Sequence, residues 1–163
     1  MELAIKNKWI SFGGSSTVTD LYGNDVLKVK GKVFSFTKKK FVTDLGDNRL
    51  YVVRNKFFSL FGRKAFVSDA GGNRIVTVKK KLFSFHDKYN VESTMGDLVI
   101  SGNILGFNYD ITLNGKSIGH ISRRVSLRDS FVLTIDDRFD YALFVALVIA
   151  IDNVTDRRRN QAN

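Results

Sequence analysis

The sequence feature that most constrains the fold is an apolar segment near the end of the chain, from Tyr141 to Ile151. Its only polar side-chain group is the tyrosine hydroxyl. At about 1.5 Å per residue, a helix of this length covers about 16 Å, roughly half of a bilayer core of about 30 Å. Asp140 and Asp152 bracket the segment. A helix that is apolar on every side, yet too short to cross a membrane, is predicted to be buried inside the protein.

We predict that this helix extends over about 138–153. Asp137 and Asp140 precede the apolar segment, where a carboxylate can cap the first turn and interact favourably with the helix dipole. Three consecutive arginines, 157–159, follow the segment and suit the C-terminal end of a helix. We expect residues 1–156 to form a single domain and residues 157–163 to form a basic, disordered tail.

Much of the preceding chain repeats one strand-turn-strand unit. In each copy, a Thr-Asp or Ser-Asp pair leads through three residues, at least one of them Gly, to Asn, and a strand and a Phe-Ser element follow. Asp, Gly and Asn tolerate the left-handed backbone of tight turns, so each copy predicts a hairpin. The flanking runs alternate apolar and polar residues, as half-buried strands do. The three turns lie at 18–24, 42–48 and 67–73, and a looser version lies at 110–121.

The repeats predict a mainly β fold. Strands of typical length, about five to six residues, would give about ten to twelve strands before residue 137. A period of about 25 residues could also indicate a solenoid or a propeller, but propeller blades are longer. Closure of a meander removes its exposed edges, and the absence of proline is compatible with continuous strand pairing. We therefore predict a closed antiparallel β-barrel around the apolar helix, with a core rich in the 14 phenylalanines.

Composition narrows the classes of function. There are no cysteines, which excludes structural disulfides, thiolate catalysis and Cys-based zinc sites. The N-terminal residues show neither the basic nor the apolar region of a signal peptide, so a cytoplasmic location is predicted. With 26 Lys and Arg against 16 Asp and Glu, the net charge of +10 favours anionic partners, although it could serve solubility alone.

No residue pattern indicates catalysis, a metal or a cofactor. His86 and His120 are the only histidines, and neither belongs to a spaced metal-binding motif. The sequence contains no G-x-S-x-G element, and residues 102–106 lack the ending of a phosphate-binding loop. Asp136 and Asp137 are adjacent acids before a helix, a position typical of capping. We predict a non-enzymatic domain without a cofactor.

Clusters of basic and aromatic residues at the predicted strand ends are the candidate binding residues. If the repeats are structurally equivalent, these clusters gather on one rim of the barrel. Each cation close to an anionic membrane would contribute about 1 kcal/mol, and an exposed Phe61 could insert beside them. Alternatively, the lysines only protect strand edges and the phenylalanines fill the interior. The candidate cations are Lys38, Lys39, Lys40, Arg63, Lys64, Lys79, Lys80 and Lys81.

The chain resembles the LURP-one-related family over most of its length, and the helix with its bracketing Asp residues is the most specific part of the resemblance. The resemblance is carried by residues 129–135, by the apolar segment with its bracketing Asp140 and Asp152, and by Gly119 to Arg124. It implies a twelve-stranded barrel around a central C-terminal helix, a fold shared with the tubby C-terminal domain and more remotely with phospholipid scramblases. Tubby domains bind phosphoinositides, but no residue here matches their lipid-binding positions. The cysteine-rich and calcium-binding features of scramblases have no counterpart.

Two functional hypotheses follow. The first is a binding domain that recognises an anionic ligand, such as a phospholipid or phosphoinositide headgroup, at the membrane surface. The second is a structural or regulatory protein-interaction barrel without a lipid ligand. Nucleic acid ranks below lipid, because no RNA-recognition or helix-turn-helix motif is present. The sequence does not indicate an oligomeric state.

Overall fold

The computed structural model describes residues 1–6, 15–32, 35–56, 63–80, 88–103, 108–124 and 130–155. Within these residues the chain forms twelve β-strands followed by one α-helix. The strands are β1 (Glu2–Lys6), β2 (Ser15–Asp20), β3 (Asp25–Gly31), β4 (Lys40–Thr43), β5 (Arg49–Asn55), β6 (Arg63–Asp69), β7 (Arg74–Lys80), β8 (Lys88–Ser93), β9 (Leu98–Asn103), β10 (Asn108–Leu113), β11 (Lys116–Arg124) and β12 (Ser130–Ile135). The helix is α1 (Tyr141–Thr155).

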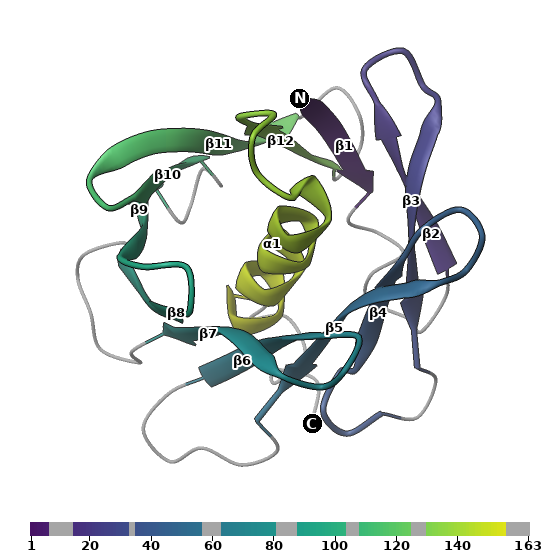
Figure 1. Ribbon diagram of the computed structural model, residues 1–163, viewed down its shortest axis with the longest axis horizontal. Coiled ribbons are helices and arrows are strands. Elements are labelled where there is room, and N and C mark those ends of the chain that lie inside the picture. The colour runs from purple at the N-terminus through teal and green to yellow at the C-terminus, as the bar shows by residue number, and fades with distance from the viewer. Residues whose placement is uncertain are drawn as a thin grey trace, which may run out of the picture.

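The strands form a closed barrel in which every pairing is antiparallel (Figure 1). Each strand pairs with its neighbours in sequence, and β12 returns to pair with β1, where Leu3 lies opposite Leu133. Closure leaves no strand edge unpaired among these twelve strands, which is how an all-antiparallel sheet avoids edge-to-edge association. The predicted barrel is confirmed.

The three repeated turns share one hydrogen-bonding pattern. In each turn the Asp carboxylate accepts hydrogen bonds from both the backbone N–H and the side-chain amide of the Asn four residues later, at 2.7–2.9 Å. The side-chain hydrogen bond from the Asn is the main reason that each Asp has a lowered pKa. The residue before the Asn has a positive φ of 89°, 68° or 91°, which favours Gly and tolerates Asp. The Asp–Asn pairs are Asp20–Asn24, Asp44–Asn48 and Asp69–Asn73.

Helix α1 begins three residues later than predicted and ends two residues later, at Thr155. The late start has a local cause, because Phe139 N donates to Asp136 O at 3.0 Å and thereby closes a turn ahead of the helix. Asp140 is the N-cap residue, and its Oδ1 accepts a hydrogen bond of 2.9 Å from Ala142 N. Asp137 does not cap the helix but pairs with the amino group of Met1.

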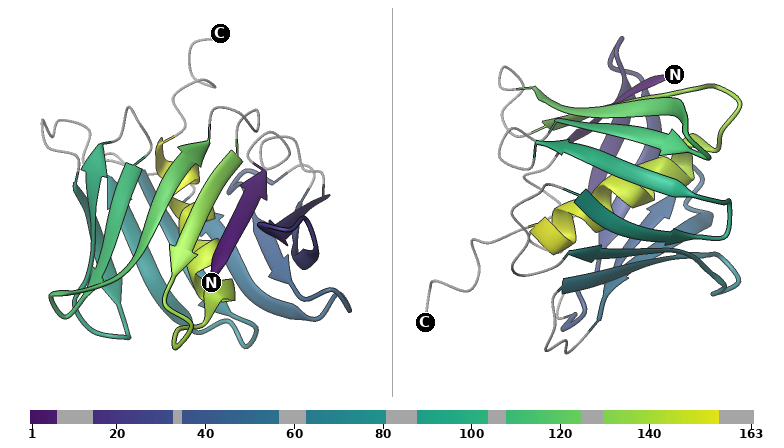
Figure 2. Two further views of the ribbon diagram at one scale, coloured as in Figure 1. Left: turned by 90° about the horizontal axis from the view of Figure 1, so that it is seen from above. Right: turned by 90° about the vertical axis from the view of Figure 1, so that its left-hand side faces the viewer.

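The helix runs through the barrel, as Figure 2 shows from two sides. Every residue from Ala142 to Ile151 is buried, in agreement with the all-round apolar sequence. Its closest packing is against β5, β6 and β7. The other inward-facing positions of the strands complete one continuous core, so the helix fills the barrel as a plug. No helix in the described parts of the chain is long and apolar enough to cross a membrane.

The prediction of a phenylalanine-rich core is wrong for the described residues. The buried strand residues are mainly Val, Ile and Leu, and only Phe131 and Phe144 are buried phenylalanines. Phe41 and Phe66 lie instead beneath arginine guanidinium groups, at 4.6 and 4.0 Å from the ring centroids. Phe36 is 89% exposed. β-Branched side chains pack well on a pleated wall, which leaves the interior space to the aliphatic helix.

The two ends of the barrel differ. The turn end carries the tight turns after β2, β4, β6, β8 and β10, together with the loop that leads into α1. The opposite end, which we call the basic end, carries the starts of β4 and β6, the ends of β5 and β7, and the C-terminal end of α1 (Figure 2).

Candidate functional site

The candidate binding cations lie at the basic end of four neighbouring strands. Strand β4 begins at Lys40, β6 begins at Arg63, and β7 ends at Lys80. Because β4, β5, β6 and β7 are consecutive in the barrel, the clusters of all three repeats lie on one side of this end. Lys81 lies outside the described residues, as does Phe61.

The register between β6 and β7 places like charges directly opposite one another. Arg63 pairs with Lys80, and Lys64 pairs with Lys79. Like charges in opposed positions of an antiparallel pair are destabilising. Glu92 on β8 forms an ion pair with Lys79, which offsets part of the repulsion between Lys79 and Lys64. The pKa of Glu92 is lowered, mainly by the hydrogen bond from Lys79 and additionally by the charge of Lys64.

Strand alternation divides these cations between two faces of the barrel wall. Ala65 and Val78 are fully buried and lie opposite each other, so they mark the inner face. Arg63 and Lys80, two positions away along their strands, share that inner parity and lie at the mouth of the barrel. Lys64 and Lys79 have the opposite parity and lie on the outer wall. Each of these sequence clusters therefore contains inward-facing and outward-facing cations next to each other.

Lys40 lies on the inner side. It is only 5% exposed, and its Nζ donates a hydrogen bond of 2.8 Å to Asn153 Oδ1 near the end of α1. The carbonyl end of a helix carries partial negative charge, which favours a cation at this position. The structure therefore separates Lys40 from its neighbour Lys39, although the two are adjacent in the Lys38–Lys40 cluster.

Lys38 and Lys39 belong to the turn before β4. Lys38 has a φ of 47°, and Ser35 organises the turn, because its carbonyl accepts a hydrogen bond from Lys38 N and its Oγ accepts one from Lys39 N. The Lys39 ammonium lies 5.1 Å from the ring centroid of Phe41. Phe36, in the same turn, is 89% exposed. Phe36 therefore does not fill the interior, and an exposed aromatic ring lies in the same turn as two lysines.

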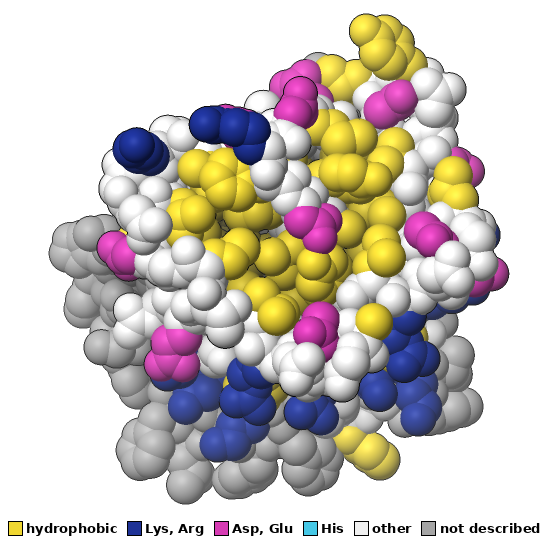
Figure 3. All heavy atoms as spheres, in the orientation of Figure 1, with side chains coloured by type: hydrophobic (Ala, Val, Ile, Leu, Met, Phe, Trp, Pro, Cys, Tyr) yellow, Lys and Arg dark blue, Asp and Glu magenta, His cyan; other side chains and the backbone are white. Residues whose placement is uncertain are grey.

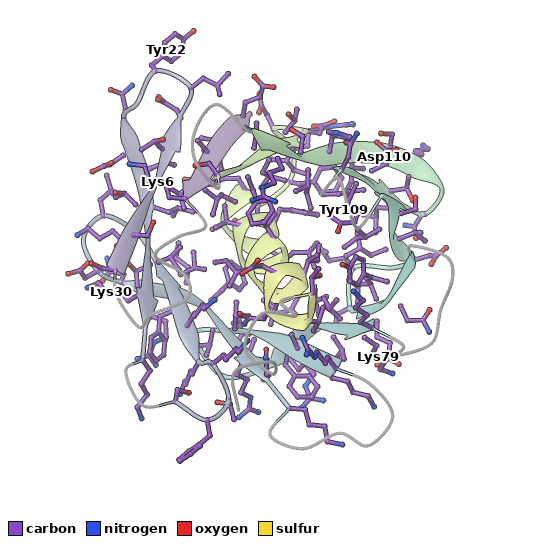
Figure 4. All side chains as sticks on the ribbon, turned by 180° about the vertical axis from the view of Figure 1, so that it is seen from behind. Lys6, Tyr22, Lys30, Lys79, Tyr109 and Asp110 are labelled. Atoms are coloured by element: carbon purple, nitrogen blue, oxygen red, sulfur yellow. The ribbon has the colours of Figure 1, made fainter. Side chains whose placement is uncertain are left out.

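A buried polar layer around the end of α1 was not anticipated from the sequence. Thr155 Oγ1 lies 2.6 Å from the Tyr89 hydroxyl, which lies 3.4 Å from the Tyr109 hydroxyl. Figure 4 shows Tyr109 among side chains that point into this end of the barrel. The Asn153 side-chain amide nitrogen and the Asn55 side-chain oxygen are buried without a hydrogen-bond partner among the described residues. The change from apolar to polar residues at Asp152–Thr155 was the available sequence signal.

The described residues offer little for metal binding. They contain no group of three His, Asp or Glu side chains that could hold a metal ion. His120 on β11 contacts Asp110 on β10, with 2.8 Å between Nδ1 and Oδ1. This pair lies on the outer wall, and both side chains are substantially exposed, at 40% and 69%. His86 lies outside the described residues.

The protein is thus a twelve-stranded antiparallel barrel closed around one helix, with a group of cations at one end. The profile of the LURP-one-related family matches residues 1–152, and the chain belongs to this family. A solved structure of an Arabidopsis thaliana protein is similar over 95% of this chain and 91% of that chain, with 21% sequence identity and a TM-score of 0.68. At this identity the likeness supports the fold. No curated protein matches the chain.

Proposed function

We propose that this barrel is a non-enzymatic domain that binds an anionic ligand at its basic end, and that the ligand is a phospholipid or phosphoinositide headgroup at the membrane surface. The observation that carries the proposal is the grouping of cations from three repeats on one side of this end, where Lys64 of β6 lies opposite Lys79 of β7. Cations gathered on one surface attract an anionic ligand.

Further features of the basic end support a membrane contact. Lys39 and Phe36 lie on the same turn, so this turn presents a cation and an exposed aromatic ring together. Aromatic rings and lysines are suited to the interfacial region of a bilayer. The grouping of cations from three repeats also favours an anionic ligand over the alternative of a protein-interaction barrel whose charge is incidental.

The proposal is tested by co-sedimentation with phosphatidylcholine vesicles that contain or lack phosphatidylserine, at about 0.15 M salt, where weak surface electrostatics are already screened. We expect retention on the anionic vesicles only. The double variant Lys39→Gln/Lys64→Gln removes one cation from the turn before β4 and one from the outer wall of β6. At about 1 kcal/mol per cation, its affinity should fall about 30-fold.

A matched control removes the same charge elsewhere. Lys116 and Arg138 lie at the turn end and are exposed, and the Arg138–Asp136 pair there is a surface ion pair of small energetic value. Lys116→Gln/Arg138→Gln should therefore bind anionic vesicles nearly as well as the unmodified protein. An equal loss of vesicle affinity in the two double variants would mean that binding depends on net charge and not on the basic end. Equal binding to vesicles with and without phosphatidylserine would sink the proposal.

Three further experiments distinguish which anionic ligand the basic end binds. Vesicles that carry a phosphoinositide in place of phosphatidylserine report on headgroup preference. Soluble inorganic phosphate added as a competitor reports on whether a free anion suffices. A short duplex DNA, used as a competitor at the same salt, reports on nucleic acid, and its displacement of the protein from vesicles at low concentration would contradict the lipid assignment.

A further inference from the structure

The turn end of the barrel carries exposed apolar side chains. Tyr22 is 92% exposed, and Leu21 and Leu45 are 47% and 46% exposed. Leu21 and Leu45 occupy the same place in neighbouring hairpins, directly after the turn Asp. Tyr22 lies at the tip of the β2–β3 hairpin, which projects from the barrel (Figures 1 and 4). Partly buried apolar residues near the same turns and in the loop before α1 pack against the core, namely Val26, Leu50, Ile75, Met95, Leu113, Phe139 and Tyr141.

Figure 3 looks onto this end and shows a broad hollowed area lined by hydrophobic side chains, with acidic side chains around and among them. In a protein of net charge +10, the turn end is locally acidic. Among the described residues, ion pairs offset three of the carboxylates at this end: Asp47 pairs with lysines, Asp136 with Arg138, and Asp137 with the amino group of Met1. The carboxylates in or beside the turns and the loop before α1 are Asp20, Asp25, Asp44, Asp47, Asp69, Asp97, Asp136, Asp137 and Asp140.

Charge separates the possible occupants of this surface. An acidic fringe repels anionic lipid and nucleic acid, so the turn end cannot share the ligand of the basic end. Asp side chains are ionised at neutral pH, and the hydrogen bonds from Asn24, Asn48 and Asn73 lower the pKa of Asp20, Asp44 and Asp69 further. An apolar surface with anionic neighbours is complementary to a partner that presents apolar and basic side chains together.

Strand pairing limits the form of that partner. All twelve described strands have two neighbours in the closed barrel, so an incoming strand would find no free edge among them. Recognition must then use side chains, as when an amphipathic helix lays its apolar face on a hydrophobic surface. We propose that the turn end docks a basic amphipathic helix of a partner protein, with its apolar face on Leu21, Tyr22 and Leu45 and its Lys or Arg residues against the turn carboxylates.

The probe for this proposal is a synthetic peptide of Leu and Lys with leucines at i, i+3, i+4 and i+7, labelled for fluorescence polarisation. A peptide with Glu in place of Lys is its control. We expect the Lys peptide alone to bind, and amide NMR shifts to fall on the turns of the turn end. The variant Tyr22→Ser/Leu45→Ser should weaken binding about tenfold or more, because two apolar contacts are lost.

Two further variants sharpen the test. Phe36→Ser removes an apolar ring of nearly the same exposure as Tyr22 from the opposite end, and should leave peptide affinity unchanged. Asp25→Asn/Asp97→Asn should weaken binding about threefold to tenfold and flatten its salt dependence. Neither Tyr22→Ser/Leu45→Ser nor Asp25→Asn/Asp97→Asn should reduce binding to phosphatidylserine vesicles, which keeps this test separate from that of the basic end.

Three results would overturn the proposal. One is a set of NMR shifts spread over the barrel or centred on the basic end. Another is an equal loss of peptide affinity in Phe36→Ser and in Tyr22→Ser/Leu45→Ser. The third is a concentration-dependent self-association, seen by analytical ultracentrifugation, that Tyr22→Ser/Leu45→Ser abolishes, because the surface would then belong to a second copy of this chain.

Discussion

Truncating Leu147 tests whether helix α1 is the core of the barrel. Leu147 lies in the middle of α1 and is 1% exposed. The change to alanine removes three buried carbon groups, which at about 0.8 kcal/mol each gives roughly 2.4 kcal/mol of lost transfer energy. A cavity in a packed core adds about 1 kcal/mol. The free energy of unfolding should therefore fall by about 3 to 4 kcal/mol. Alanine is at least as good a helix former as leucine, so helix propensity does not account for such a loss.

Leu45 provides the matched control, since it is chemically identical but 46% exposed at a turn. About half of its side chain is already in water, and no closed cavity forms, so Leu45→Ala should cost about 1 kcal/mol or less. Urea unfolding followed by circular dichroism measures both values. In a thermal scan the melting temperature should fall by about 6 to 15 °C for Leu147→Ala and by less than about 4 °C for Leu45→Ala. Losses that agree within about 1 kcal/mol would refute the assignment of α1 as a buried plug.

Three other contacts give predictions of their own. Asp140→Ala should lower the free energy of unfolding by about 1 to 2 kcal/mol, because it removes the helix cap. The Tyr51 hydroxyl donates to Asp140 Oδ2 at 2.6 Å, so a double-mutant cycle with Tyr51→Phe should show coupling between the two residues. Additive losses in this cycle would contradict the contact. Lys40→Met should lower the free energy of unfolding by about 1 to 3 kcal/mol, because Asn153 Oδ1 loses the hydrogen bond from Lys40. In urea unfolding, the double variant Lys40→Met/Asn153→Leu should recover most of the lost stability. A double variant less stable than Lys40→Met would refute the reasoning. The folded-state pKa of Asp69 is lowered, so its contribution to stability is present above the unfolded pKa of about 3.9 and is lost as the pH falls through the folded pKa. Asp69→Asn should therefore make the free energy of unfolding less sensitive to acid between about pH 5 and 2. An unchanged pH profile would count against this.

The raised pKa of Tyr51 leads to the opposite pH dependence. Burial is the main cause, and the hydrogen bond to Asp140 adds to it. A folded-state pKa above the ordinary value of about 10 means that this contribution to stability is complete below that pH and is lost as the pH rises further. Spectrophotometric titration should show a step above the ordinary tyrosine range, and Tyr51→Phe should lower the amplitude of this step by one tyrosine. An unchanged amplitude in Tyr51→Phe would contradict the raised pKa of Tyr51.

Short-range features of this protein follow from the sequence because their determinants lie within a few residues. The Asp–Asn turns are built from residues four positions apart, and the same hydrogen bonds recur in all three copies. The apolar run from Tyr141 to Ile151 dictates a buried helix whatever surrounds it. The predicted first residue of the helix was less accurate, because the turn at Asp136–Phe139 competes with the helix for the same residues.

The candidate site depends on contacts that the sequence pattern does not encode. Whether a lysine faces the interior or the outer wall depends on register, and a shift of one residue would exchange Lys39 with Lys40. The contact between Lys40 and Asn153 joins residues 113 positions apart. The opposition of Lys64 and Lys79 likewise exists only once β6 and β7 are aligned. The sequence by itself determined the strands, the turns and the buried helix, because these are set by local backbone preference and hydrophobic burial. Only the tertiary structure decided which charges meet, because closure of the barrel and its register set those distances.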